Sequence, residues 1–517
     1  MRRYGRAVPT RQLHLAQAGP AEVADALAAL RAEVGLPAMF PTEVREEAEK
    51  SAADGGSALG DGGGAKKGQG RQDRRDVELV TIDPPGSMDL DQAVHVASSG
   101  RGYIVRYAIA DVAAFVRPGG PLDAEAHRRG ATVYGPDVRT PLHPPVLSEG
   151  AASLLPDEDR PAVLWTIGLD ADGEITSSSV TRATVRSRAR LTYGEAQGQL
   201  DAGTASDSLS LLADVGRLRQ ERERDRGGVS LEVPEQEIVP GPDGSFALEL
   251  RRTLPVEGWN AQISLLTGIA AAAMMREAGV GLLRTLPPAD DRDVARLRRT
   301  AEALGIDWPD EVSYAQLVPT LESRRPAHAA FLAEATSLFR GADYLAFGVP
   351  GPDGGPPVAL PADARHAAIA AEYAHVTAPL RRLADRYATE VCLAHAAGKE
   401  PPAWVAEALP ALPETMAAAS RTAGAFERGC VDVVEAALLA GREGQAFDGV
   451  VVDVRGEAKS DGHDGGDDGA AQRGEVMLLD PAVRARIEGA DLPLGERVRA
   501  TLAEASVPDR RVLFTLG

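Results

Sequence analysis

The sequence predicts an α+β fold with a large central domain of mixed sheet and helices, a C-terminal five-stranded barrel of the OB-fold type and a short helical N-terminal region. Three observations carry this prediction. Runs with strand periodicity occur at residues 77–116, 164–169 and 178–185, helical periodicity dominates residues 259–441, and short β-rich runs return after Gly444. We therefore divide the 517 residues into domains at 1–38, 39–442 and 443–517.

The N-terminal region is predicted to be a short helical module. An amphipathic helix runs from about Ala21 to Val34, and Pro41-Thr42-Glu43 begins a second helix. A helix-turn-helix-like module and a helical strap on the main domain both fit this pattern. The Gly-rich segment at residues 52–72 is typical of a flexible linker, and it lacks the Gly-Lys-Ser/Thr of a P-loop.

The first half of the central domain is predicted to contain a sheet. Strands at Ala93–Ala97 and Tyr103–Ala110 pair through a turn, and strands at Leu164–Leu169 and Ser178–Val185 follow. Helices are expected at residues 194–227.

Short strands are then expected at residues 228–256, before the mainly helical part, in which Asp290 caps a helix that reads on to Leu304. The barrel strands are expected in four β-rich runs, with an acidic Asp/Gly-rich loop at residues 455–474 between them. These runs are Ala446–Val454, Val476–Leu479, Arg497–Ala503 and Arg511–Leu516.

Composition limits the partners and the compartment. The formal net charge of −20 has the wrong sign for a nucleic-acid binder, so such a partner would need a local basic channel or a metal ion. Only Cys392 and Cys430 are present and no CxxC occurs, which favours a reducing cytoplasm. No apolar run is long enough to span a bilayer, and the basic N-terminus lacks the apolar segment of a secretion signal. We expect a soluble, cytoplasmic monomer with no membrane partner.

One acidic stretch stands out as a candidate metal site. Asp83, Asp89 and Asp91 fall within nine residues, after a strand that Pro84-Pro85-Gly86 ends. Leu90 between two aspartates suggests an extended segment with both carboxylates on one face. Clustered carboxylates are hard oxygen ligands that suit Mg²⁺ or Mn²⁺. By itself the stretch is more typical of a solvated acidic turn or a Ca²⁺-type loop, although it lacks the Gly and Glu of an EF-hand loop.

Further motifs give this stretch a context. Thr81-Ile82-Asp83 with Asp89-Leu90-Asp91 resembles the signature of the ribonuclease II / ribonuclease R (RNB) family catalytic domain, and the resemblance covers residue 40 to the end. It implies a Mg²⁺-dependent, processive 3′→5′ exoribonuclease that degrades single-stranded RNA to nucleoside 5′-monophosphates, with Mn²⁺ as another possible metal. Five more blocks follow in the order found in the family: Ala108–Val112, Arg129–Tyr134, Ala189–Tyr193, Tyr373–Asp385 and Ala425–Arg428.

The resemblance also assigns roles to single residues. The metal position corresponds to Asp83, Asp89, Asp91 and Gln92. The catalytic groups are Asp91, Arg381 and Glu427, of which Arg381 would clamp phosphate oxygens with its guanidinium. For Glu427 an exposed helix charge is a serious alternative.

RNA contacts are expected from aromatic and basic side chains. Tyr134 corresponds to an aromatic residue that stacks on a base, and Tyr193 to one near the ribose of the 3′ end. Arg381 and Arg382 would contact the RNA backbone. The alternatives are half-buried core tyrosines and, for Arg382, a surface charge at a helix start.

The chain departs from the family pattern in four places. Gln92 stands where the family has a fourth acid, neutral residues surround Asn260 where two Glu are usual, and Ile238 replaces a stacking aromatic. The N-terminal region is too short and too helical for the paired cold-shock barrels of the family. Two other hypotheses therefore remain: a catalytically weakened RNA-binding member, and a phosphodiesterase acting on DNA or short oligonucleotides.

Overall fold

The computed structural model describes the fold over most of the chain. The described residues are 20–56, 70–230, 235–240, 246–251, 253–322, 325–339, 341–351, 353–455, 472–478 and 483–516. Most of the expected Gly-rich linker and most of the expected acidic loop lie outside these residues. Within the described residues, no helix is both long and apolar enough to cross a membrane.

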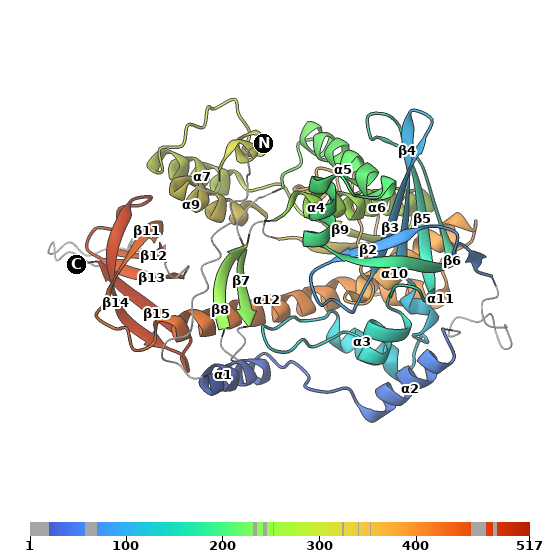
Figure 1. Ribbon diagram of the computed structural model, residues 1–517, viewed down its shortest axis with the longest axis horizontal. Coiled ribbons are helices and arrows are strands. Elements are labelled where there is room, and N and C mark those ends of the chain that lie inside the picture. Colours follow the sequence, from blue (N-terminus) through green and yellow to red (C-terminus); the bar gives the residue numbers. More distant parts are fainter. Residues whose placement is uncertain are drawn as a thin grey trace.

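A six-stranded sheet, ordered β1-β6-β2-β3-β4-β5, forms the frame of the central domain (Figure 1). The predicted β3–β4 hairpin is confirmed as an antiparallel pair, and β5 and β6 are longer than the predicted runs. The first half of β6 pairs with β5, and its last residues run parallel to β2, which brings Asp83 beside Thr192. The strands are β1 (Gln72–Asp73), β2 (Leu79–Asp83), β3 (Gln92–Ser99), β4 (Gly102–Ala110), β5 (Asp159–Leu169) and β6 (Ile175–Thr192).

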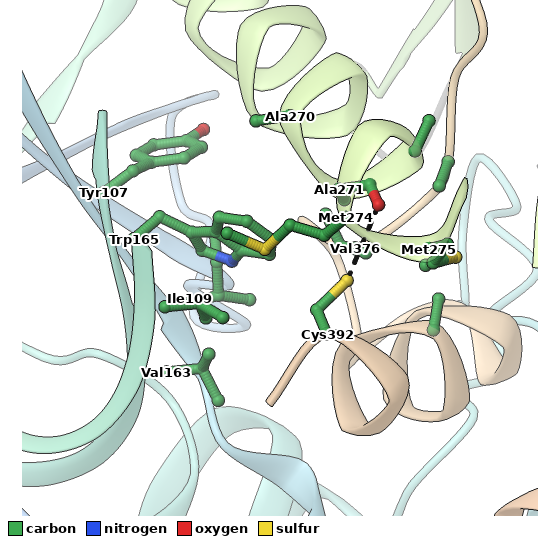
Figure 2. Packing of buried hydrophobic residues seen from close by; sticks show 14 of the residues in the cluster. Tyr107, Ile109, Val163, Trp165, Ala270, Ala271, Met274, Met275, Val376 and Cys392 are labelled. Carbon is green, nitrogen blue, oxygen red and sulfur yellow. Dashed lines mark hydrogen bonds between the residues drawn. The ribbon is translucent and has the colours of Figure 1, made fainter. Parts of the chain in front are cut away.

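Helices α6 (Pro255–Ala278) and α10 (Leu383–Ala396) pack with this sheet around the largest core cluster (Figure 2). Tyr107 and Trp165 from the strands, Met274 from α6 and Cys392 from α10 are all buried there. Each large apolar side chain buried in this way contributes roughly 1.5–3 kcal/mol. The cluster therefore fixes the position of α6 relative to β4 and β5.

The remaining elements of the central domain surround this core. The expected helices at 194–227 and the expected strands at 228–256 are confirmed, and the Asp290 side chain accepts a hydrogen bond from the Arg292 backbone N–H (2.8 Å) as the N-cap of α7. The pair β9–β10 was not expected. The elements are η1 (Val112–Ala114), α3 (Pro121–Arg129), η2 (Val146–Ala151), α4 (Tyr193–Ala202), α5 (Asp207–Asp225), β7 (Glu235–Pro240), β8 (Phe246–Arg251), β9 (Gly281–Thr285), α7 (Asp291–Ala303), α8 (Tyr314–Leu317), η3 (Val318–Thr320), α9 (Pro326–Ala335), η4 (Thr336–Phe339), β10 (Asp343–Phe347), α11 (Ala403–Ala408), η5 (Leu409–Ala411) and α12 (Leu412–Leu439).

The two N-terminal helices lie apart from each other on the main body (Figure 1). Helix α1 (Pro20–Glu33) packs its apolar side on α12, where Val23, Leu27 and Leu30 join a buried cluster. Helix α2 (Thr42–Ala53) is joined to α3, because Glu47 accepts a hydrogen bond from the Leu122 backbone N–H (2.8 Å). The helices are thus arranged as two straps.

The C-terminal strands form a closed five-stranded barrel, which confirms the predicted OB-fold type. Strand β13 was not anticipated, because Arg and Glu alternate with its buried Ala485 and Ile487. Helix α12 runs from the central domain to this barrel (Figure 1). The barrel strands are β11 (Ala446–Arg455), β12 (Gln472–Leu478), β13 (Arg484–Gly489), β14 (Arg497–Ser506) and β15 (Arg511–Leu516).

Candidate active site

Three segments that are distant in sequence meet at one end of β2 and β3. They are the acidic loop at residues 84–91, a hairpin at residues 131–140, and the turn at residues 377–382 that precedes α10. The Thr132 backbone N–H donates to the Arg381 carbonyl (2.9 Å), which joins the hairpin to the turn. All the candidate residues except Glu427 lie in or next to these segments.

Asp83 ends β2 at the edge of this site. Its Oδ2 atom is buried and has no hydrogen-bond partner among the described residues. Burial raises the pKa of the Asp83 carboxyl to about 6, and the nearby charge of Asp89 adds to the shift. A buried carboxylate oxygen without a partner is costly, so this atom is available to a cation.

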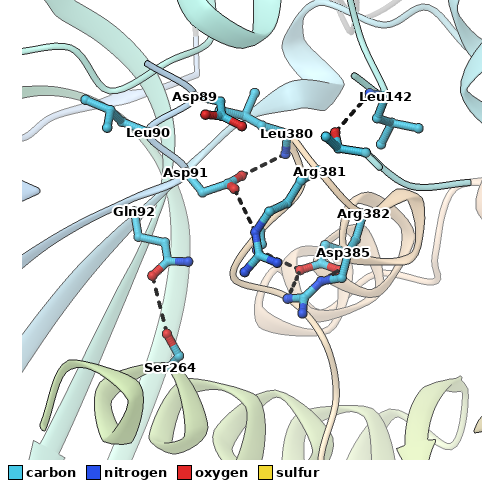
Figure 3. Close-up of polar contacts among 12 residues, drawn as sticks. Asp89, Leu90, Asp91, Gln92, Leu142, Ser264, Leu380, Arg381, Arg382 and Asp385 are labelled. Carbon is cyan, nitrogen blue, oxygen red and sulfur yellow. Dashed lines mark hydrogen bonds and ion pairs between the residues drawn. The ribbon is translucent and has the colours of Figure 1, made fainter. Parts of the chain in front are cut away.

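Asp91 is the most deeply buried of the three aspartates, with 4% of its surface exposed. Its Oδ1 accepts a hydrogen bond from the Leu380 backbone N–H (2.7 Å), and its Oδ2 lies 3.5 Å from Nε of Arg381 (Figure 3). Burial raises the pKa of Asp91 to about 8, although the guanidinium of Arg381 acts in the opposite direction. The protein alone therefore does not stabilise the charged form of this carboxyl.

Asp89 is bonded through both carboxylate oxygens. The Tyr134 hydroxyl donates to Oδ2 (3.1 Å), and Nη1 of Arg139 donates to Oδ1 (2.8 Å). Arg139 also forms an ion pair with Glu149 in η2. This arginine thus links the acidic loop to η2.

Arg381 and Arg382 have different surroundings. The Arg381 side chain is 40% exposed next to Asp91, whereas Arg382 is 19% exposed and forms two hydrogen bonds with Asp385 (3.0 and 2.9 Å). Asp385 also accepts from the Ala378 backbone N–H (2.7 Å), so it pins the turn from which Arg381 extends. The structure thus places Arg382 in a structural ion pair rather than at an exposed helix start.

The two tyrosines flank the aspartates. The Tyr134 side chain is exposed (52%) although its hydroxyl turns inward to Asp89, which leaves the ring open to solvent. Tyr193 begins α4 and is half-buried, and its hydroxyl is hydrogen-bonded to Asn260 of α6. Burial, together with the charge of Asp83, raises the pKa of Tyr193, so its hydroxyl stays protonated.

Gln92 points toward α6 and not along Asp91 (Figure 3). Its Oε1 atom accepts hydrogen bonds from the Tyr107 hydroxyl and from the Ser264 hydroxyl (3.3 Å). Ser264 lies one helical turn after Asn260, so the hydroxyl that contacts Gln92 and the Asn260 side chain share one face of α6.

Glu427 lies on α12 and is exposed. Its neighbour Phe426 is buried under Gly135, in the hairpin that carries Tyr134. The structure thus places Glu427 beside the hairpin but gives it no hydrogen bond to Asp91 or Arg381 in the described residues.

The donor set fits a divalent cation in part. Among the described residues, no three His, Cys, Asp or Glu side chains are gathered into a group that could hold a metal ion. Asp83 and Asp91 are nevertheless suited to one, because each is a buried carboxyl whose charge the protein leaves poorly compensated. Asp89 is instead bonded to Arg139 and Tyr134.

Sequence reasoning missed the residues that hold the site in place. Arg139 and Ser264 belong to no motif, and Asp385 ends the Tyr373–Asp385 block without a role assigned to it. No local signal marked Arg139, since the pairing of Val133 with Thr140 that brings Tyr134 and Arg139 side by side is seen only in the structure.

Comparison with known proteins places this site in a family. A family model described as the RNB domain matches residues 71–396, and one described as the RNase II-type exonuclease C-terminal S1 domain matches residues 445–517. Exosome complex exonuclease RRP44 homolog A of Arabidopsis thaliana is 31% identical over 332 residues, covering 61% of this chain and 34% of that protein. Ribonuclease R of Escherichia coli strain K12 is 29% identical over 333 residues, covering 61% of this chain and 39% of that protein.

This chain therefore spans less than half the length of these two curated relatives. Among solved structures, Mycoplasma genitalium RNase R in complex with ribose methylated single-stranded RNA has a TM-score of 0.80 and 20% identity, over 96% of this chain and 78% of that chain. This is a likeness of fold. Because the RNB model matches more than half of the 517 residues and the S1 model matches the barrel, the chain belongs to the RNB family, as its motifs indicated.

Proposed function

We propose that this protein is a metal-dependent 3′→5′ exoribonuclease that degrades single-stranded RNA processively to nucleoside 5′-monophosphates. The observation that carries the proposal is the pairing of buried Asp91 with the half-exposed guanidinium of Arg381, in a chain of the RNB family. The relatives named above are an exosome exonuclease and a ribonuclease R, which supports the same reaction class.

Different residues would bind the metal ion and the phosphate. Asp83 and Asp91, with Asp89 next to them, would hold Mg²⁺ or Mn²⁺, which neutralises the scissile phosphate and lowers the pKa of a water molecule. Arg381 grips phosphate oxygens and stabilises the charge that develops in the transition state. Its position depends on Asp385, which holds the turn before α10.

The RNA contacts follow from the two tyrosines. The exposed Tyr134 ring stacks on a base, a contact worth about 1–3 kcal/mol that tolerates any sequence. The protonated Tyr193 hydroxyl, with Asn260, is suited to a ribose 2′-OH, which distinguishes RNA from DNA. Glu427 beside the hairpin would lie near the 3′-terminal nucleotides. Arg382 would contribute to the RNA contacts indirectly, because its ion pair with Asp385 helps to hold the turn that carries Arg381.

The setting we propose is a cytoplasmic monomer. Cys392 and Cys430 are both free and buried, in keeping with a reducing compartment.

The test is digestion of a 5′-labelled single-stranded RNA on a sequencing gel, with Mg²⁺ and then with EDTA. We expect Mg²⁺-dependent shortening from the 3′ end to a short 5′-labelled end product with few intermediates, and release of nucleoside 5′-monophosphates from a uniformly labelled RNA run in parallel. An all-deoxy oligomer of the same sequence should remain intact; equal rates would instead favour a phosphodiesterase acting on DNA or short oligonucleotides.

A catalytically weakened RNA-binding protein is the second candidate. The neutral Gln92 and Asn260, and the bonding of Asp89 to Arg139, favour it. Tight binding of the RNA without any Mg²⁺-dependent release of nucleotides would support this candidate against the enzyme.

A further inference from the structure

We infer that the metal centre of this chain takes a single divalent cation, and that Arg139 supplies the second positive charge beside Asp89. The inference rests on the proposed function to the extent that the acidic site binds a metal ion. It assigns a role to a residue outside the acidic stretch.

Arg139 is held in the site by two carboxylates. Its Nη1 atom donates to Oδ1 of Asp89 (2.8 Å), and its guanidinium also pairs with Glu149. The side chains of Arg139 and Asp89 are 28% and 12% exposed, so the pair is largely shielded from water. A guanidinium is always charged, and shielding strengthens its interaction with a carboxylate.

The hairpin explains why Arg139 reaches Asp89. The backbones of Val133 and Thr140 exchange two hydrogen bonds (2.9 and 2.8 Å), which places Tyr134 and Arg139 next to each other. Both side chains reach the same carboxylate, and the Tyr134 hydroxyl takes its second oxygen (3.1 Å). Asp89 therefore has each of its oxygens bonded by protein groups.

Gln92 cannot supply a further oxygen ligand for a metal ion. Its Oε1 atom is its only good acceptor, and Tyr107 and Ser264 already donate to it. An oxygen that accepts two hydrogen bonds has used both lone pairs. The position next to Asp91 is therefore closed to a cation.

Asp83 and Asp91 remain as the ligands for one ion. Oδ2 of Asp83 is buried without a partner in the described residues, and Oδ2 of Asp91 has only the long contact of 3.5 Å with Arg381. A second ion at Asp89 would lie beside the fixed positive charge of Arg139, which repels it. One ion and one fixed arginine therefore share the charge of the three aspartates.

The test is titration of the full chain with Mn²⁺ alone, with free Mn²⁺ followed by its EPR signal. We expect one Mn²⁺ per chain. In Arg139→Gln we expect about tenfold tighter binding, because a positive charge a few ångströms away is lost and an oxygen of Asp89 is released. We expect the double variant Arg139→Gln/Gln92→Asp to bind two ions.

Two controls separate this effect from general charge loss. Arg139→Lys keeps the charge and should bind one ion with an affinity like that of the parent chain. Arg186→Gln removes an arginine of β6 that is paired with Asp159 of β5 (2.7 Å), away from the three aspartates, and it should change the affinity much less than Arg139→Gln. Equal effects of Arg139→Gln and Arg186→Gln would overturn the inference.

The stoichiometry of the unaltered chain decides the question even where a variant folds poorly, because either two ions or no ion would overturn the inference. RNA digestion measured in parallel separates it from the proposed function. A chain that digests RNA but binds two Mn²⁺ keeps the function and refutes the inference. A chain that binds one Mn²⁺ and digests no RNA refutes the proposed function and keeps the inference.

Discussion

Two buried acidic regions lie next to each other on the sheet, and they balance their charge differently. Asp111 follows β4 and Asp91 precedes β3, and the Ala110 backbone N–H donates to the Asp91 carbonyl (2.9 Å). Asp111 is paired with Arg71 (2.6 Å) and with Arg182 (3.1 Å). Burial alone would raise the pKa of Asp111, but these guanidiniums hold that pKa below its ordinary value. At Asp91, burial prevails and raises the pKa to about 8.

The difference separates a structural charge from a functional one. The protein satisfies Asp111 completely, so this carboxylate joins β4, β6 and the segment before β1 without needing a ligand. The protein leaves the charges of Asp91 and Asp83 incompletely balanced. A cation that binds there can therefore neutralise negative charge that no protein group neutralises. Between these two aspartates, Asp91 and Asp111, the raised pKa thus marks the acid of the site and the lowered pKa marks the acid of the framework.

The largest expected effect is on catalysis, from Asp91→Asn. An isosteric amide keeps the acceptor for the Leu380 N–H but removes the charge, so we expect cleavage of single-stranded RNA to fall by about a thousandfold or more. RNA binding, measured by filter retention, should remain. Turnover close to that of the parent chain would show that Asp91 takes no part in the reaction.

The converse substitution, Asp111→Asn, should affect stability instead. It leaves Arg71 and Arg182 without their shared carboxylate, and breaking a buried pair typically costs about 3 kcal/mol. Urea unfolding monitored by circular dichroism measures the loss, with Asp91→Asn as the matched control that should not destabilise. Equal destabilisation by both variants would remove the distinction between the two regions.

The third expectation concerns pH in the metal-free chain. The folded-state pKa of Asp91 is raised from 3.8 to about 8, so between these values the folded chain binds more protons than the unfolded chain. The contribution of Asp91 to stability is therefore present at low pH and is lost as the pH rises. Between pH 6 and 8 we expect a loss of up to about 2 kcal/mol in EDTA.

The two asparagine variants test this origin. Asp91→Asn should reduce the slope of the urea midpoint with pH above pH 7, where the raised pKa of Glu390, about 7, contributes little, whereas Asp111→Asn should leave that slope unchanged. An equal slope above pH 7 in Asp91→Asn and the parent chain would assign the effect to another group.

The smallest expected effect is on RNA affinity, from Tyr134→Ala. Loss of a stacking ring should weaken binding of a short single-stranded RNA about tenfold. Tyr134→Phe keeps the ring and removes only the hydroxyl bond to Asp89, so its affinity should match that of the parent chain. Fluorescence anisotropy measures both, and equal weakening in the two variants would mean that the hydroxyl, not stacking, matters.

Much of the fold followed from local patterns. The hairpin of β3 and β4, the cap at Asp290 and the barrel were readable because strand alternation, turn residues and capping residues act within a few positions. Strand β13 escaped because its exposed face is charged, and β9–β10 because short pairs in a helical region carry little signal.

The candidate site was predictable to a lesser degree. The aspartates, Arg381 and Tyr134 stand in motifs, and the structure brings them together. For Arg382 the motif did not distinguish a contact with RNA from the ion pair with Asp385, because both need the same side chain at the same position.

By itself the sequence determined the order of the elements, the family and the acidic stretch from Asp83 to Gln92, since these depend on neighbouring residues. Only the tertiary structure decided how those acids are balanced. Arg139 reaches Asp89 across 50 residues, and Ser264 reaches Gln92 across 172. Such contacts follow from how the hairpin and α6 pack on the sheet, and packing brings together residues that no local pattern connects.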